Sequence, residues 1–259
     1  MRVTVCELDA AAVERSWELL VAHVHAAGSD LVVLPEMAFA EWLPSTRDVR
    51  PQRWQQAVTA HDGWLARLPQ LGAVTVAGSR PTATASGRFN EAFVWAAGSG
   101  YRAVHRKTYL PDEPGFWEAS WYDRGPTRFE PVDTPAGRLG FLVCTELWFL
   151  EHARAYAAAG VELLVCPRVT PADSVARWLA GGRVAASCAG AFCVSSNRAG
   201  EAAGVRFGGT GWVAEPDGDV LAATSADEPC VTVDVDLAVA ARAKRTYPRY
   251  VDDSPLERS

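Results

Sequence analysis

Short apolar segments alternate along this chain with longer segments in which apolar residues recur every three or four positions. The short, β-branched segments predict strands, and the longer ones predict amphipathic helices. Strands are expected at residues 3–8, 31–35, 73–79, 90–96, 101–106, 138–144, 162–167, 191–197, 209–215, 219–225 and 229–236. Helices are expected between Asp9 and Gly28 and at residues 51–68, 147–160 and 173–189. Strands that alternate with helices are typical of an α/β fold.

Few interruptions break this rhythm. Residues 110–131 are rich in Pro, Gly, Trp and Asp and predict a long ordered loop, but no segment has linker composition before the last dozen residues. We therefore expect a single domain over residues 1–259, with about 248–259 forming a polar tail or a dimer arm.

Composition narrows the class of protein. Of the 259 residues, 49% are hydrophobic and 22% charged, and the net charge is −6, which argues against a nucleic-acid or anionic-membrane surface. The N-terminus has no signal-peptide pattern and no apolar segment reaches membrane-spanning length, so a cytoplasmic location is expected. Six scattered cysteines without C-x-x-C pairs are expected to be reduced thiols, most of them in the core.

Several kinds of site are missing from the sequence. It contains no P-loop, no Rossmann glycine pattern, no HExxH and no GxSxG, and its five histidines lack metal-ligand spacing. We therefore expect neither a metal nor a cofactor, and carboxylates, lysines and thiols remain as candidates for chemistry.

Cys144 is the first candidate, since it follows a buried strand and precedes a helix in the segment FLVCTELWF. The free N–H groups at the start of that helix would stabilise a thiolate and could donate to an oxyanion. Most free cysteines, however, are simply small buried residues, and position alone does not decide between the two interpretations.

Lys107 and Glu36 occupy similar places in the chain. Only two of the 25 basic residues are lysines, Lys107 and Lys244; Lys244 lies in a polar helix where we expect it to be solvated. An ammonium can approach a tetrahedral intermediate more closely than a guanidinium. Glu36 follows the strand LVVLP, where partly apolar surroundings could make it a general base, although a glutamate there is more often a loop residue. Each of Glu36, Lys107 and Cys144 ends a strand, and we expect them on one rim of one sheet.

Together these segments resemble the nitrilase superfamily of carbon–nitrogen hydrolases. The matching segments are LVVLPE at Glu36, HRKTYLP at Lys107 and GFLVCTELWF at Cys144, with weaker similarity up to about residue 247. The resemblance implies a four-layer α-β-β-α sandwich. It also implies that Glu36 is the general base, that Cys144 is the nucleophile, and that Lys107 and the backbone amide of Thr145 stabilise the oxyanion.

The resemblance also implies a second glutamate in the loop after the lysine. Glu118 is the first choice and Glu113 the second. Where many amidases of the superfamily have an aromatic residue after the nucleophile, this chain has Thr145, which bears on the substrate. The implied activity is hydrolysis of a small amide or N-carbamoyl amine. A nitrile hydrolase, or a catalytically silent interaction protein on the same fold, is the alternative.

Residues beside these positions are candidates for binding the substrate. Trp117, Trp121, Trp148 and Phe39 could line a compact pocket or merely pack its rim. Arg168, at the end of another strand, could clamp a substrate carboxylate or form a structural ion pair. Relatives of this kind usually form homodimers or larger assemblies, which we also expect here.

Overall fold

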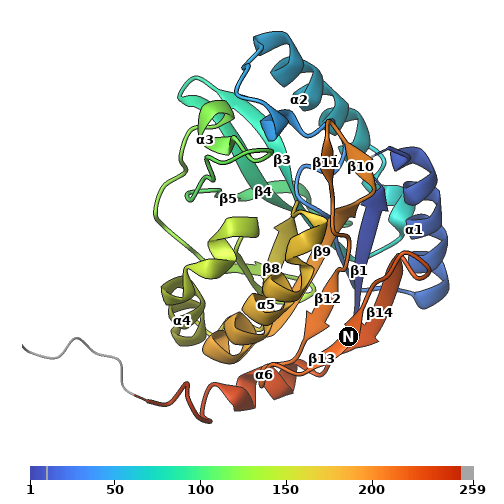
Figure 1. Ribbon diagram of the computed structural model, residues 1–259. Coiled ribbons are helices and arrows are strands. Elements are labelled where there is room, and N and C mark those ends of the chain that lie inside the picture. The colour runs from blue at the N-terminus through green and yellow to red at the C-terminus, as the bar shows by residue number, and fades with distance from the viewer. Residues whose placement is uncertain (10, 252–259) are drawn as a thin grey trace, which may run out of the picture.

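Two facing β-sheets form the centre of the protein, and helices cover their outer faces (Figure 1). The structure is a computed structural model that describes residues 1–9 and 11–251. In the described residues, nine of twelve hydrogen-bonded strands form one continuous path, from which β12, β13 and β14 branch, and this path bends into the two sheets. The bend lies where Glu7–Asp9 of β1 pair with Asn197–Ala199 of β9, in parallel.

The first sheet has the strand order β5-β4-β3-β2-β1-β14. Its strands are β1 (Arg2–Asp9), β2 (Leu31–Val33), β3 (Thr75–Thr84), β4 (Gly87–Ala96), β5 (Gly100–Arg106) and β14 (Cys230–Asp234). β1, β2 and β3 run parallel, and β3, β4 and β5 form an antiparallel meander. β5 therefore points the same way as β2, so Glu36 and Lys107 follow strands that end on the same side.

The second sheet has the order β13-β12-β9-β8-β7-β6. Its strands are β6 (Val132–Thr134), β7 (Gly137–Phe141), β8 (Leu163–Arg168), β9 (Phe192–Ala199), β12 (Trp212–Ala214) and β13 (Val220–Ala223). β7, β8 and β9 are parallel. A separate hairpin, β10 (Glu201–Ala202) with β11 (Val205–Arg206), was not predicted from the sequence.

The alternation of side chains along the strands builds the layers. In β2, Leu31 and Val33 join the large core between the sheets, whereas Val32 between them faces the opposite side and packs with α1 (Val13–Ala27). α2 (Pro51–Leu65) also lies on the first sheet, against β3. α4 (Leu150–Ala158) and α5 (Val175–Ala189) pack together over the second sheet (Figure 1). The predicted α-β-β-α sandwich is thereby confirmed.

The C-terminal segment is hydrogen-bonded to the region around α5. After α6 (Leu237–Ala243), the Lys244 ammonium donates to the backbone oxygens of Val161, Ala189 and Gly190, at 2.5–2.9 Å. The expectation that Lys244 is solvated was wrong, because its side chain binds the carbonyl groups at the end of α5. Arg249 is buried as well and donates to the Ser187 oxygen. The rest of the expected tail, residues 252–259, lies outside the described residues.

The boundaries of the other elements differ little from those predicted. The loop at 110–131 contains one short helix, α3 (Glu118–Trp121). The helix expected at 147–160 is divided into a 3₁₀ turn, η3 (Cys144–Trp148), and α4, because the backbone of Phe149 is not helical. None of the helices within the described ranges is long and apolar enough to cross a bilayer.

Candidate active site

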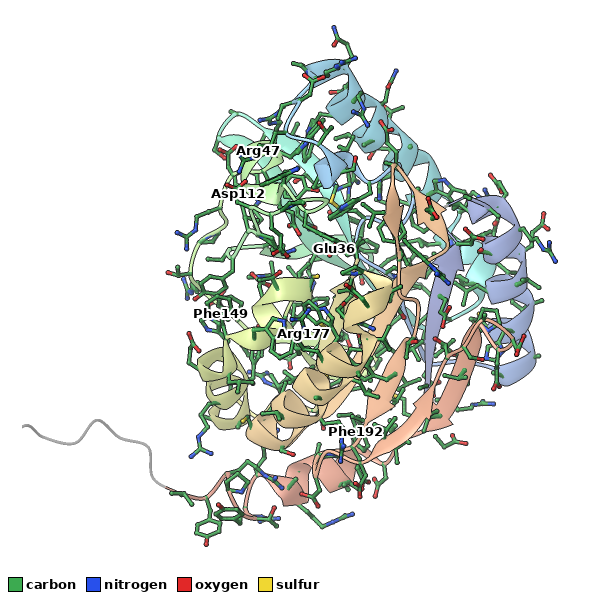
Figure 2. All side chains as sticks on the ribbon, in the orientation of Figure 1. Glu36, Arg47, Asp112, Phe149, Arg177 and Phe192 are labelled. Atoms are coloured by element: carbon green, nitrogen blue, oxygen red, sulfur yellow. The ribbon has the colours of Figure 1, made fainter. Side chains whose placement is uncertain are left out.

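A pocket of about 950 Å³ lies where three segments meet. They are the loop after β5 (residues 109–124), the turn after β7 (144–149) and the segment after β8 (169–178). All three follow the carboxyl ends of strands, the edge at which α/β sheets usually bind ligands. In Figure 2, Glu36 lies near the middle of the molecule, with Phe149 and Arg177 on the elements below it.

Glu36 lies three residues beyond β2 and is completely buried. Its Oε1 accepts hydrogen bonds from Asn90 Nδ2 (2.6 Å) and Lys107 Nζ (2.8 Å), and its Oε2 accepts one from the backbone N–H of Val169 (3.1 Å). The backbone N–H of Glu36 donates to the Arg168 oxygen (3.2 Å). All three partners of the Glu36 carboxyl group are donors, so both of its oxygens act as acceptors.

Lys107 follows β5 directly and connects two carboxylates. Its ammonium donates to Glu36 Oε1 (2.8 Å) and to both oxygens of Glu118 (2.8 and 2.7 Å). Burial lowers the pKa of Lys107, but the charges of Glu118 and Glu36 together outweigh burial, and the pKa is raised well above its ordinary value. The site therefore favours the charged ammonium form of Lys107.

Glu118, the first residue of α3, is the carboxylate that completes this network. It is buried and lines the pocket, and its pKa is raised to about 8, chiefly by burial, against the opposing charge of Lys107. Glu113, the second choice for this position, is exposed on the pocket rim. Glu118, and not Glu113, is thus the second carboxylate bonded to Lys107.

Cys144 enters the pocket from the other sheet, three residues beyond β7. The expectation that the three groups share the rim of one sheet was therefore wrong, since Glu36 and Lys107 follow strands of the first sheet. Cys144 is 3% exposed, and its Sγ lies 3.5 Å from the Val169 oxygen, to which the thiol donates. Its backbone has φ of 49°, a left-handed conformation that is strained for any residue with a side chain.

The surroundings of Cys144 favour the neutral thiol. Burial raises the pKa of Cys144 well above its ordinary value, and the charge of Glu36 raises it further, while Lys107 opposes them. This differs from the sequence-based expectation that helix N–H groups would stabilise a thiolate. A single 3₁₀ turn offers few such groups, and two buried carboxylates lie close by.

Glu146 organises the turn that carries Cys144, a role that the sequence did not reveal. Its carboxylate accepts hydrogen bonds from the backbone N–H groups of Val143 (2.8 Å) and Thr108 (2.7 Å). Both Glu146 oxygens also contact His105 Nε2 (2.9 and 2.8 Å). Glu146 therefore joins the turn that carries Cys144 to the segment that carries Lys107.

The residues expected to contact a substrate divide into two groups. Thr145, Glu113 and Trp148 line the pocket, and Trp148 is 41% exposed and packs against Trp178. Trp117 does not line it: its ring lies under the guanidinium of Arg47, 3.9 Å away. Arg47 in turn pairs with Asp112 at 2.9 Å on the exposed side of the loop (Figure 2).

Trp121, Phe39 and Arg168 also lie away from the pocket. Trp121 is fully buried, with its indole N–H bonded to the Thr46 oxygen. Phe39 packs in the core outside the first sheet, stacked on Trp64 with ring centroids 4.8 Å apart.

Arg168 has neither of its two expected roles, because its guanidinium is enclosed within the second sheet. It donates to Ser195 Oγ (2.7 Å), Thr170 Oγ1 (3.1 Å) and the Thr210 oxygen (2.6 Å), and lies 3.7 Å from the Trp212 ring centroid. No carboxylate is among these contacts. Its neighbour Val169 is the residue that lines the pocket.

Two further pocket residues had no signal in the sequence. Tyr122 lines the pocket near Glu118, and Arg177 lies exposed at its mouth on α5. Neither stands at a strand end, where the candidates were sought. No cluster of three or more His, Cys, Asp or Glu side chains within residues 1–9 and 11–251 has the arrangement of a metal site.

Comparison with known proteins places this arrangement in context. A model of the carbon-nitrogen hydrolase family matches residues 4–245. A glutamine-dependent NAD(+) synthetase from Rhodobacter capsulatus is 31% identical over 229 residues, 86% of this chain but 40% of the synthetase. An N-carbamoylputrescine amidase from Arabidopsis thaliana is 25% identical over 261 residues, 92% of this chain and 86% of the amidase.

Solved structures share the fold. A carbon-nitrogen hydrolase from Helicobacter pylori G27 superposes with a TM-score of 0.86 at 23% identity, covering 96% of this chain and 94% of its own. A Glu-to-Gln mutant of the amidase from Nesterenkonia sp. AN1, solved with acrylamide added to its active-site cysteine, has a TM-score of 0.75 at 20% identity, covering 93% of this chain and 95% of its own.

Proposed function

This chain belongs to the carbon–nitrogen hydrolase family, and from that membership we propose that it hydrolyses a small amide or N-carbamoyl amine through a covalent intermediate on Cys144. The observation that carries the proposal is the buried Lys107 ammonium, bonded to Glu36 and Glu118 beside the Cys144 thiol. An ammonium between two carboxylates, next to a neutral thiol at the base of a pocket, supplies a base, a cation and a nucleophile.

Acylation begins with the neutral thiol, which requires a base because the pKa of Cys144 is raised. Glu36 takes the thiol proton as Sγ attacks the carbonyl carbon, and a tetrahedral oxyanion forms. Lys107 and the Thr145 backbone N–H stabilise that charge. Two of the three contacts of Lys107 go to the same carboxylate, so one N–H can turn to the oxyanion while Glu118 stays bound.

Collapse of this intermediate breaks the C–N bond. The proton held by Glu36 passes to the departing nitrogen, and an amine or ammonia leaves a thioacyl-enzyme. Glu36 then deprotonates a water molecule, which attacks the thioester and releases the acid or carbamate together with the thiol. Every proton taken from sulfur or water is returned to nitrogen or sulfur, so the cycle needs no cofactor.

The substrate class rests on the pocket and the relatives. A volume of about 950 Å³ admits a small molecule but no folded protein. The similarity to an amidase that acts on N-carbamoylputrescine supports an N-carbamoyl amine as one candidate and a simple primary amide as the other. A nitrile would use the same three groups and remains the alternative substrate.

The test is intact-mass measurement and ammonia release with a panel of small amides, N-carbamoyl amines and nitriles. We expect a transient acyl adduct and ammonia release with wild type, and neither with Cys144→Ala. Cys188→Ala is the matched control, because that half-buried cysteine lies on α5 outside the pocket lining. An adduct that persists in Cys144→Ala, or no turnover of any compound by wild type, would refute the proposal.

A further inference from the structure

Tyr122 carries a hydroxyl with no hydrogen-bond partner, although the residue is 4% exposed and lines the pocket. Its position is fixed from both sides. The backbone N–H of Tyr122 donates to the Glu118 oxygen (2.9 Å), and its ring packs on Trp54 at 5.4 Å. A buried hydroxyl without a partner is rare, because it has lost its hydrogen bonds to water and gained none.

The surroundings of the hydroxyl indicate which part of a substrate it meets. Burial raises the pKa of Tyr122 well above its ordinary value, and Glu118, Glu36 and Cys144 raise it further, against Arg198. Tyr122 lies one turn after Glu118, which places it at the catalytic end of the pocket, whereas the exposed residues Trp148 and Arg177 form the mouth.

The proposed reaction indicates which part of the substrate lies at each end of the pocket. The departing nitrogen must lie near Glu36, which delivers its proton, and the rest of the acyl group extends towards the mouth. From this geometry we infer that the Tyr122 hydroxyl oxygen accepts a hydrogen bond from the N–H of the departing nitrogen and thereby selects amides and N-carbamoyl groups. This inference rests on the proposed function.

The same contact favours catalysis over binding. As Sγ–C forms and C–N breaks, the nitrogen gains the proton that Glu36 took from sulfur and becomes positively charged. A hydrogen bond from this nitrogen to the phenol oxygen strengthens as that charge develops, so it stabilises the transition state more than the bound substrate. A substrate without N–H groups on its leaving atom gains nothing from it.

A structural role for the hydroxyl is the competing explanation. Two guanidinium nitrogens of the buried Arg198, Nε and Nη1, also lack partners, and a water molecule could join them to Tyr122. In that case Tyr122→Phe would lower the stability of the protein and leave its substrate preference unchanged. If the substrate supplies the partner, the empty enzyme loses nothing when the hydroxyl is removed.

The experiment compares Tyr122→Phe with wild type on a primary amide and the methyl ester of the same acid, which form the same thioacyl-enzyme. We expect kcat/KM for the amide to fall about tenfold, equivalent to ~1.4 kcal/mol. The value for the ester should stay within about twofold, and the melting temperature should be unchanged or higher. Tyr101→Phe is the matched control, since its hydroxyl bonds Glu91 (3.0 Å) outside the pocket lining, and both rates should stay at the wild-type level.

Equal losses on amide and ester, no loss on either, or a lower melting temperature with unchanged rates would each overturn this role of Tyr122. A wild type that the ester acylates but that turns over no amide would instead refute the proposed function, and this role with it.

Discussion

Replacing Glu36 with Gln should change two properties of Cys144 in opposite directions. As general base, Glu36 accelerates turnover, and its removal should lower kcat/KM for an amide by about 10²- to 10⁴-fold. Burial is the main reason that the pKa of Cys144 is raised, and the negative charge of Glu36 raises it further. A neighbouring charge shifts a pKa by about 1–3 units, so the pKa of Cys144 should fall by that amount in Glu36→Gln.

The contacts of Glu36 indicate that the same substitution also lowers folding stability. Its two oxygens accept from Asn90, Lys107 and Val169, and a glutamine can accept at only one of its two terminal atoms. The new NH₂ group faces at least one donor, which costs about 1–3 kcal/mol of folding stability. With the Glu36 charge gone, Lys107 lowers the pKa of Cys144 against burial and the charge of Glu118.

Two assays separate the effects. Ammonia release gives kcat/KM. The pH profile of Cys144 alkylation by iodoacetamide, followed by intact mass, gives the thiol pKa. The Cys144→Ala variant is alkylated in parallel so that reaction at the other cysteines can be subtracted. The matched control is Glu113→Gln, the same change at an exposed position of the same pocket, which should leave the alkylation profile in place. Turnover at the wild-type level would refute the role as base. An alkylation profile moved to higher pH would refute the electrostatic reasoning.

Two further predictions concern stability. Arg168→Met should lower the free energy of unfolding by about 3 kcal/mol in urea titrations, because it removes three hydrogen bonds made by a buried charge, and it should leave KM within about twofold. The control Arg177→Met should change the free energy of unfolding by less than ~0.5 kcal/mol. A large rise in KM for Arg168→Met alone would contradict the structure. Burial lowers the pKa of His61 to about 3, so the folded state excludes a proton that the unfolded state binds below about pH 6.5. Stability should therefore fall as pH falls from 6.5, by about 2 kcal/mol at pH 5, and a His61→Gln variant with an equally steep decline would disprove this.

The proposed catalytic residues could be selected from the sequence because sheet topology brings strand ends together. Glu36, Lys107 and Cys144 each follow a strand, and parallel strands place their carboxyl ends on one side. That reasoning placed all three on one sheet, because the pairing of β1 with β9, which joins segments about 190 residues apart, cannot be read from the sequence.

The errors have a different origin, the direction of a side chain at a strand end. Arg168 and Val169 are adjacent, but successive side chains point to opposite faces, so Val169 lines the pocket and Arg168 lies within the sheet. Phe39 follows the left-handed turn at Met37, which directs it into the core beside α1. A one-residue difference of this kind leaves no trace in hydrophobic periodicity.

Glu146 and His105 could not be paired from the sequence for another reason. They are separated by 41 positions, and their contact depends on how the loop after β5 lies against the turn after β7. The sequence shows an acidic residue two positions after Cys144 but does not show its hydrogen-bond partners. The structure identifies them as the backbone N–H groups of Val143 and Thr108.

The backbone is strained at two positions, and a buried charged side chain holds each of them in place. Met37, directly after Glu36, has φ of 45°, and Cys144 has φ of 49°; a left-handed conformation of this kind costs about 1–3 kcal/mol. Beside each lies a buried charged side chain bonded to the backbone. Arg198 donates to the Met37 and Ala40 oxygens, and Glu146 accepts from Val143.

Removing Arg198 or Glu146 would allow the neighbouring turn to relax, and the Glu36 carboxylate or the Cys144 thiol would move with the backbone. General-base catalysis requires the two to stay within hydrogen-bond reach of each other or of a shared proton. The buried charges next to Met37 and Cys144 therefore act on the reaction through geometry. They hold in place two strained conformations, and in these conformations the side chains of Glu36 and Cys144 both contact the backbone of Val169.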